Sequence, residues 1–281
     1  MRNRMIKAKI AELERIARKH IDSVPYSVSL RWVFYRLLQN GIYSEKGDYD
    51  RWCAQASKFR HDGTWNPDML EDSTRVVVSR GLAQAWKKQK IIDYIIEPRN
   101  LAGYFLNSHF DRQACYAELW FEARAMLGQF EQYTRYIVLR PFGGDYTIGP
   151  KYQAAKDLMK NAKRFGKPIK ILYFGDCDKK GNSILASAST GPKGLMKWCD
   201  VPVEWVWCGL TQAQATLYKI PSNPDKPGEY QWEALTDAAA REIISHALEE
   251  HLDLSLIDTV EQEAIKKGKR FAAELKRRLT V

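Results

Sequence analysis

In the C-terminal part of the chain, short apolar runs alternate with segments of helical periodicity, and this alternation restricts the fold more than any other feature. The apolar runs cover residues 117–121, 136–139, 169–174 and 201–207. Helical patterns at 123–133 and 151–165 separate the first three runs. Strands joined by single helices require right-handed crossovers, which give a parallel sheet covered on both faces. We therefore predict an α/β domain with a mainly parallel sheet over residues 106–281.

Residues 1–105 have the pattern of a set of short helices. Apolar residues recur at three- and four-residue spacing in 4–20 and 29–38, and further helices are expected at 49–59 and 74–96. The segment 63–72 between the last two is rich in turn residues. This pattern fits a helix-turn-helix or winged-helix DNA-binding domain. A helical cap with a purely structural role fits nearly as well, and the pattern does not separate the two.

The chain is basic, and its excess charge is uneven. Forty-four Lys and Arg residues against 34 Asp and Glu residues give a net charge of +10, of which +7 falls in residues 1–100. A basic N-terminal part indicates a polyanionic partner, most often nucleic acid. A merely soluble basic protein would have the same composition. The candidate contacts to a DNA backbone are Lys87, Lys88, Lys90 and Lys151.

Missing motifs disfavour several functions and locations. The chain has no Walker A, GxGxxG or GxSxG motif, which disfavours a P-loop ATPase, a dinucleotide enzyme and a serine hydrolase. It also lacks an apolar stretch of about 18 residues and a signal-peptide pattern. We therefore expect a cytoplasmic protein that associates with DNA and not with a membrane.

Carboxylates follow two of the predicted strands. Glu122 comes directly after 117–121, and Asp176 and Asp178 come just after 169–174. Ligands of open α/β sheets bind beyond the carboxyl ends of the strands, and carboxylate oxygens there suit Mg²⁺ or Mn²⁺. A cation would also relieve the repulsion among them. In the alternative interpretation, Asp176 and Asp178 only form a turn and cap a helix.

These residues resemble the Toprim domain, the metal-binding fold of topoisomerases, primases and some nucleases, which has a glutamate after its first strand and Asp-x-Asp after its third. Residues 174–181, Phe-Gly-Asp-Cys-Asp-Lys-Lys-Gly, look like the Toprim motif of the topoisomerase VI A subunit and its meiotic double-strand-break relatives. Residues 231–235, Gln-Trp-Glu-Ala-Leu, are similar to the Glu-x-Asp-Ala-Leu segment of that family. Residues 30–35, Leu-Arg-Trp-Val-Phe-Tyr, resemble its Arg-x-x-Tyr-Tyr helix. The likeness covers about residues 28–255 and is greatest to the short, stand-alone A-like proteins of phages or bacteria.

Two positions depart from the family pattern. The family commonly has Glu-Lys-Asp-Ala after the first strand, whereas here Glu122 is followed by Ala-Arg-Ala, which changes its surroundings. Phe34 replaces the first tyrosine of the pair, and Tyr35 keeps the position of the reactive one. In the alternative interpretation, Tyr35 is an ordinary half-buried aromatic residue of an amphipathic helix.

The resemblance implies a mechanism. Tyr35 attacks a DNA phosphate to form a 5′-phosphotyrosyl link, Arg31 stabilises the phenolate or holds the phosphate, and Glu122, Asp176 and Asp178 bind Mg²⁺ or Mn²⁺. It also implies a homodimer, in which the tyrosine of one subunit works with the metal site of the other, and a separate ATPase subunit for strand passage. Two alternatives stay open: a Toprim nuclease that cuts DNA or RNA with metal-activated water, and a DNA-binding protein whose catalytic site has decayed.

Overall fold

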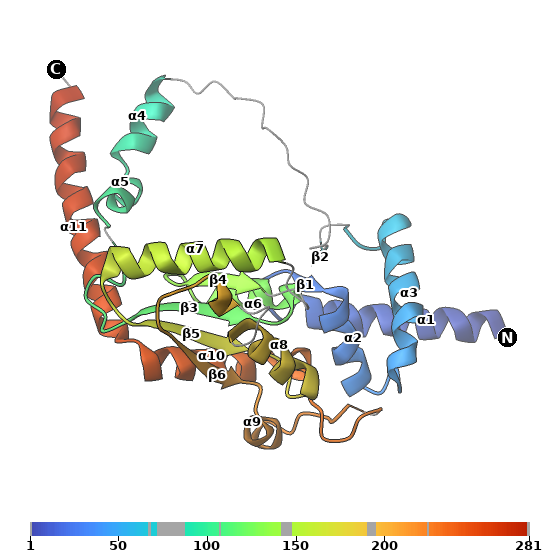
Figure 1. The fold of residues 1–281 in the computed structure, drawn as a ribbon. Helices are drawn as coiled ribbons and strands as arrows, with labels where there is room; N and C mark the ends of the chain where they lie inside the picture. Colours follow the sequence, from blue (N-terminus) through green and yellow to red (C-terminus); the bar gives the residue numbers. More distant parts are fainter. Residues whose placement is uncertain are drawn as a thin grey trace.

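A four-stranded, all-parallel β-sheet forms the centre of the C-terminal part, which confirms the predicted α/β class (Figure 1). The computed structural model describes residues 2–66, 69–71, 88–106, 108–141, 148–189, 195–223 and 225–279. The strand order is β4-β3-β5-β6, so β3 and β5 are neighbours although β4 lies between them in the chain. The strands are β3 (Tyr116–Phe121), β4 (Val138–Pro141), β5 (Ile169–Phe174) and β6 (Val203–Gly209).

Helices cover both faces of this sheet (Figure 1). Right-handed crossovers place the helix of the β3–β4 connection on one face and the helices of the β4–β5 and β5–β6 connections on the other. The first helix is α6 (Leu127–Tyr133), and α10 (Asp237–His251) contacts both α6 and β6. The opposite face carries α7 (Ile148–Phe165), α8 (Lys179–Ser189) and the 3-10 helix η4 (Leu195–Lys197). Shorter elements in the connections are η3 (Arg124–Met126), α9 (Gln212–Leu217) and η5 (Trp232–Ala234).

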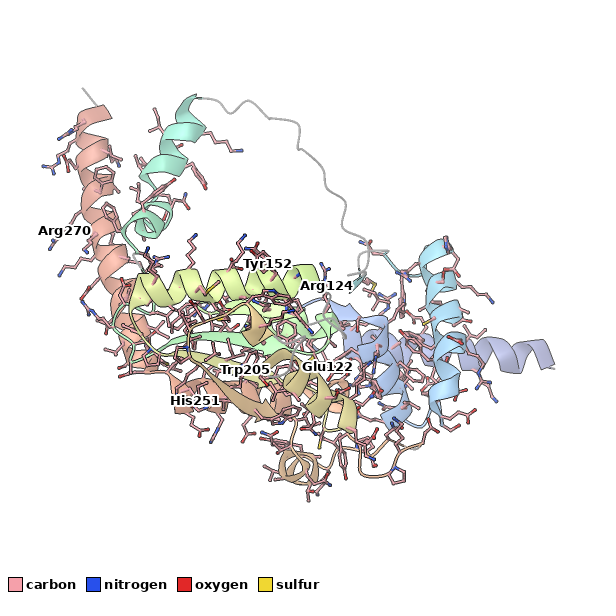
Figure 2. The ribbon with its side chains drawn as sticks, viewed as in Figure 1. Glu122, Arg124, Tyr152, Trp205, His251 and Arg270 are labelled. Carbon is pink, nitrogen blue, oxygen red and sulfur yellow. The ribbon has the colours of Figure 1, made fainter. Side chains whose placement is uncertain are left out.

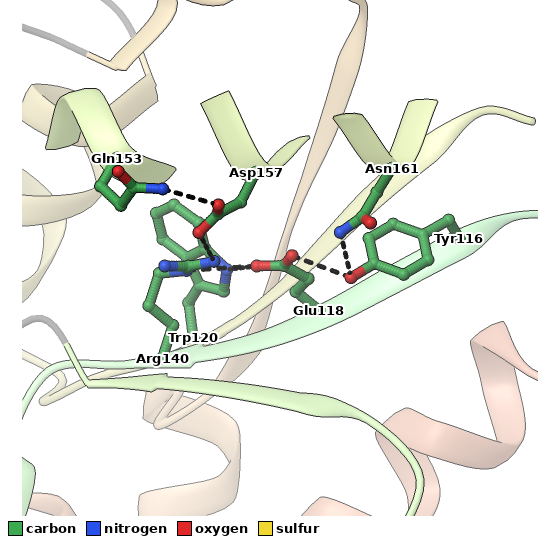
Figure 3. Close-up of polar contacts among 7 residues, drawn as sticks. All are labelled: Tyr116, Glu118, Trp120, Arg140, Gln153, Asp157 and Asn161. Atoms are coloured by element: carbon green, nitrogen blue, oxygen red, sulfur yellow. Dashed lines mark hydrogen bonds and ion pairs between the residues drawn. The ribbon is translucent and has the colours of Figure 1, made fainter. Parts of the chain in front are cut away.

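A buried polar network fixes α7 on the sheet (Figure 3). Glu118 of β3 is fully buried and accepts hydrogen bonds from the Tyr116 hydroxyl (2.9 Å) and the Trp120 indole (2.8 Å). Arg140 of β4 donates to Glu118 (3.2 Å) and to Asp157 of α7 (3.3 Å). A buried carboxylate needs such donors and a cation. Glu118 therefore serves to join the sheet to α7.

The N-terminal helices have a core of their own. The helices α1 (Arg2–Ile21), α2 (Leu30–Gln39) and α3 (Tyr49–His61) pack around buried Trp52 and Trp65, and the 3-10 helix η1 (Lys46–Asp48) precedes α3. Ser29 begins α2, because its side chain accepts the N–H of Trp32 (3.2 Å). The two-residue strands β1 (Val28–Ser29) and β2 (Leu70–Glu71) pair in parallel. A wing is an antiparallel hairpin, and none is formed by residues 2–66 and 69–71.

Two further helices pack against the C-terminal helix. α4 (Lys88–Ile96) and α5 (Pro98–Phe105) contact α11 (Leu254–Leu279), which extends beyond the sheet at the end opposite α1–α3 (Figure 1). The expected boundary at residue 105 groups α4 and α5 with the N-terminal helices, whereas their contacts in the structure are with α11. Most of the helix expected at 74–96 lies outside the described residues, and its last part is α4. Within the described ranges, no helix has the length and apolar character needed to cross a membrane.

Candidate active site

The structure brings Glu122 and Asp176 together at the carboxyl edge of the sheet. β3 and β5 are paired along their whole length, from Tyr116 opposite Ile169 to Phe121 opposite Phe174. Glu122 and Asp176 follow the ends of these two strands, and the backbone N–H of Asp176 donates to Glu122 Oε2 (3.1 Å). Figure 2 shows Glu122 at the end of the sheet that faces the N-terminal helices.

Asp178 caps the helix that follows it. Its Oδ1 accepts the backbone N–H of Gly181 (2.6 Å) in the first turn of α8. Gly181 is needed there, because a Cβ would lie 2.3 Å from the carbonyl oxygen of Asp176. One carboxylate oxygen of Asp178 therefore caps a helix, as the alternative interpretation of the Asp-x-Asp pair expects. The same carboxylate also acts electrostatically on Glu122.

Glu233 is a fourth carboxylate of this cluster, and sequence reasoning did not assign it a role. It lies in η5 and is 4% exposed. The preceding residue, Trp232, donates its backbone N–H to Asp176 Oδ1 (2.8 Å), which brings η5 against the Asp-x-Asp loop. The only sequence signal was that Glu233 falls within the segment 231–235, which resembles a family motif.

The carboxylates of this cluster repel one another. Burial raises the pKa of Glu122, and the charges of Asp178 and Glu233 raise it further. Burial also raises the pKa of Asp176 well above its usual range, together with the charges of Glu233 and Glu122. Such repulsion is relieved by a proton or by a bound cation.

The donor set suits a hard divalent cation. No group of three or more His, Cys, Asp or Glu side chains in the described part of the chain is already arranged to hold a metal ion. Mg²⁺, however, commonly takes only one or two protein carboxylates and completes its shell with water and substrate phosphate. The adjacent pair Glu122 and Asp176 meets that smaller requirement.

Tyr35 and Arg31 lie beside the same cluster, in the same chain. Arg31 Nε is 3.4 Å from Glu233 Oε1, and Arg31 Nη2 donates to Gln231 Oε1 (3.1 Å). Burial raises the pKa of Tyr35 to about 12, while Arg31 opposes this shift through its charge and a hydrogen bond to the phenol. Glu233 and Asp176 act on Tyr35 in the same direction as burial. A phenol, a cation and the acidic cluster are therefore neighbours within one chain.

Tyr35 lines two hollows. A cavity of about 360 Å³ is lined by residues of α2, by the loop that follows α2 and by the loop before η5, among them Leu38, Tyr43 and Asn223. A smaller hollow of about 170 Å³ is lined by Arg31, Phe34, Tyr35 and Tyr49. The phenol of Tyr35 is therefore accessible from these hollows.

Arg36 joins the tyrosine helix to the loop that carries Glu233. It is 4% exposed, and its Nη2 donates to the carbonyl oxygens of Glu233 (2.8 Å) and Leu235. Gln39 adds a hydrogen bond to the carbonyl oxygen of Ala234 (2.7 Å). Together these contacts fix the position of α2 relative to η5.

The four lysines predicted to contact DNA fall in different surroundings. Lys87 lies outside the described residues, and Lys88 begins α4 but its side chain is not described. Lys90 is exposed on α4. Lys151 lies on α7 with 7% of its surface exposed, so its side chain is not displayed at the surface. Their role in DNA binding stays a prediction.

Comparison with known proteins adds no relative. No family model matches the chain, and neither the curated proteins nor the solved structures contain a match. The functional interpretation therefore depends on the geometry of Tyr35, Arg31 and the four carboxylates.

Proposed function

We propose that this protein binds DNA and cleaves its strands by tyrosine transesterification, as a topoisomerase VI A subunit does, but with Tyr35 and the metal site of the same chain in place of the two-subunit arrangement that the resemblance implies. In this proposal residues 1–105 contain a winged-helix-like DNA-binding unit, and residues 106–281 contain a Toprim-like unit. One observation carries the proposal: Arg31, one helical turn from Tyr35, forms an ion pair with Glu233, which lies against Asp176. In this proposal the Tyr35 phenol, the Arg31 guanidinium and the acidic cluster act on the same DNA phosphate.

The chemistry expected of the protein's own residues is a simple exchange. The Tyr35 oxygen forms a bond to the DNA phosphorus, and the bond from phosphorus to the 3′ oxygen breaks. The phenol proton is lost and the 3′ oxygen gains one, so the proton count is unchanged. The high pKa of Tyr35 keeps the phenol neutral near pH 7, so its proton leaves to solvent as the oxygen bonds to phosphorus. Arg31 is about half exposed, so it has further N–H donors for the phosphate oxygens.

A divalent cation is part of the proposal. Glu122 and Asp176 would hold Mg²⁺ or Mn²⁺, with Asp178 beside them. When bound, the cation supplies positive charge that stabilises the phosphate and the leaving oxygen. The protein's part is to hold the carboxylates next to the phenol. Because burial and neighbouring carboxylates raise the pKa of Asp176, its carboxylate would stay unprotonated there only with a cation bound.

The partners proposed are double-stranded DNA, a second copy of the chain and a separate ATPase subunit. The ATPase is needed because strand passage consumes ATP and the sequence has no Walker A motif. The site of action proposed is the cytoplasm, on DNA.

A covalent adduct tests the proposal directly. Duplex DNA labelled at its 3′ ends is incubated with the protein and Mg²⁺ or Mn²⁺, then denatured and separated on a gel. We expect label to migrate with the protein, since a 5′-phosphotyrosyl link retains the 3′-labelled fragment. Tyr35→Phe abolishes the adduct, whereas Tyr43→Phe, in the same cavity, keeps it.

Other outcomes favour the alternatives. If DNA is cut without label on the protein, and Tyr35→Phe cuts equally well, the protein is a nuclease that uses metal-activated water. If no metal supports cleavage and duplex binding remains salt-sensitive, the protein is a DNA-binding protein without catalytic activity.

A further inference from the structure

The last two helices, α10 and α11, carry a sharply divided charge. Residues 237–263 contain eight acidic residues and one basic residue, for a net charge of −7. Residues 264–279 contain seven basic residues and one acidic residue, for a net charge of +6. This basic segment is the part of α11 that extends away from the sheet beside α4 and α5 (Figure 1). We call α4, α5 and residues 264–279 the arm.

Close packing of backbones fixes the arm. A Cβ on Gly268 of α11 would lie 2.6 Å from the carbonyl oxygen of Pro98 and 2.9 Å from the backbone nitrogen of Ala102. A glycine inside a helix costs about 1 kcal/mol relative to alanine, so the close approach accounts for its presence. Ala272, one turn further along, is also buried, and the rings of Phe105 and Phe271 meet edge-on with centroids 5.7 Å apart.

This packing turns the basic side chains outward. With Gly268 facing α5, Lys266, Lys267, Lys269 and Arg270 are all exposed. None of these four forms an ion pair or a hydrogen bond with a side chain of the described residues. The acidic residue Glu274 is already paired with Arg278 (2.6 Å). Figure 2 shows Arg270 on α11, at the end of the molecule opposite Glu122.

We propose that the arm is a second DNA-binding surface, which holds the phosphate backbone of a duplex away from Tyr35. The choice of DNA rests on the proposed function. Four cations within five residues span about 6 Å of helix axis. B-DNA carries one negative charge per about 1.7 Å of its axis, so about four phosphate charges fall within that length. The number of lysine and arginine charges therefore matches the number of phosphate charges along the same length. Contacts to phosphates carry no sequence preference.

Salt-dependent DNA binding tests the arm. Fluorescence anisotropy of a labelled duplex, without divalent metal, gives the affinity at several salt concentrations. The double variant Lys266→Gln/Arg270→Gln should lower the slope of log affinity against log salt by about 2 and weaken binding roughly 10- to 100-fold near 0.1 M salt. The control Lys197→Gln/Lys219→Gln removes the same charge from exposed residues outside the arm and should leave the slope unchanged.

Each outcome has one meaning. An unchanged slope in the arm variant refutes the proposal, and so does a shift in oligomeric state measured by light scattering, because the arm then contacts another copy. The adduct test separates this inference from the proposed function. An adduct with an unchanged slope refutes only the arm, and a reduced slope without an adduct refutes only the cleavage reaction.

Discussion

Replacing Arg36 tests whether α2 and the acidic cluster are held in register by the contacts described above. Arg36 reaches from the helix that carries Tyr35 to the carbonyl oxygens of Glu233 and Leu235. It also donates to Gln39 Oε1 (2.8 Å), and its guanidinium lies 4.9 Å from the centre of the Trp32 ring. Arg36→Met keeps an unbranched apolar stem, shorter than that of arginine, and removes every one of these donors.

The size of the effect follows from two opposing terms. Burial lowers the pKa of Arg36 to about 10, which corresponds to about 3 kcal/mol of lost solvation. Two hydrogen bonds from a charged donor to backbone carbonyls contribute about 1.5–3 kcal/mol each. The balance is a stabilisation of about 0–3 kcal/mol, centred on about 1.5 kcal/mol, which Arg36→Met should remove. Arg36→Lys retains a buried charge on a single nitrogen, so we expect it to be no more stable than the methionine variant.

Urea denaturation measures this loss as a change in the free energy of unfolding. Arg15→Met is the control, because Arg15 is an exposed arginine whose ion pair with Glu12 (2.6 Å) is screened by solvent and contributes little to stability. We expect Arg36→Met also to reduce adduct formation, since η5 positions Glu233 and holds Asp176. If Arg36→Met unfolds like the wild type and the Arg15 control, the assigned role of Arg36 is wrong.

Three further predictions concern the arm and the active site. Gly268→Ala should lower the free energy of unfolding by about 1–2 kcal/mol, because its Cβ meets the backbone of α5 and overpacking costs about 1–3 kcal/mol. The control Gly103→Ala, in open space on α5, should raise the free energy of unfolding by up to about 1 kcal/mol in the same denaturation assay. Equal effects of the two substitutions would contradict the close packing. A mixture of Tyr35→Phe and Asp176→Ala chains should form no adduct, because Tyr35 and the carboxylates are neighbours within one chain; recovered activity would show that the tyrosine works with the metal site of a partner subunit. Since the pKa of Tyr35 is raised to about 12, the phenolate fraction grows about tenfold per pH unit below that value. The single-turnover rate of adduct formation should therefore rise between pH 7 and 9. A rate that does not change with pH would mean that loss of the phenol proton does not limit the reaction.

The strands were predictable to the extent that they are buried. β5 begins and ends where the apolar run 169–174 does, because it lies in the middle of the sheet with nearly every side chain buried. The edge strand was predicted at 136–139 and is found at Val138–Pro141. Ile137 is apolar because it packs into the core, and Pro141 can end the strand because an edge position needs no N–H from it. An apolar run in the sequence marks the residues that are buried. At the edge of a sheet these are not the same residues as those that pair with the neighbouring strand.

The candidate site was predictable only in the part that is local in sequence. Glu122 and Asp176 follow apolar runs and could be found from these alone. Their adjacency depends on the sheet order, which a single sequence does not contain. Glu233 and Arg36 lie 197 residues apart in the chain and are joined by a side-chain to main-chain hydrogen bond. Apart from the likeness of residues 231–235 to a family motif, no local pattern marks either residue as part of a site. Glu233 becomes a neighbour of Tyr35 only because the folded chain packs η5 against α2.

Net charge averaged over half of the chain hides local differences in charge. Residues 101–281 have a net charge of only +3, which pointed to the N-terminal part as the DNA-binding half. That average conceals the adjacent segments of −7 and +6 in residues 237–263 and 264–279. A phosphate group interacts with charges within about one Debye length, roughly 10 Å at 0.1 M salt, which is about seven residues of helix. Within that distance on either side of Gly268 lie four exposed cations and three acidic residues, and the acidic residues are already paired with His109, Arg112 and Arg278. The arm therefore presents four cations without a paired carboxylate, although the part of the chain that contains it is nearly neutral.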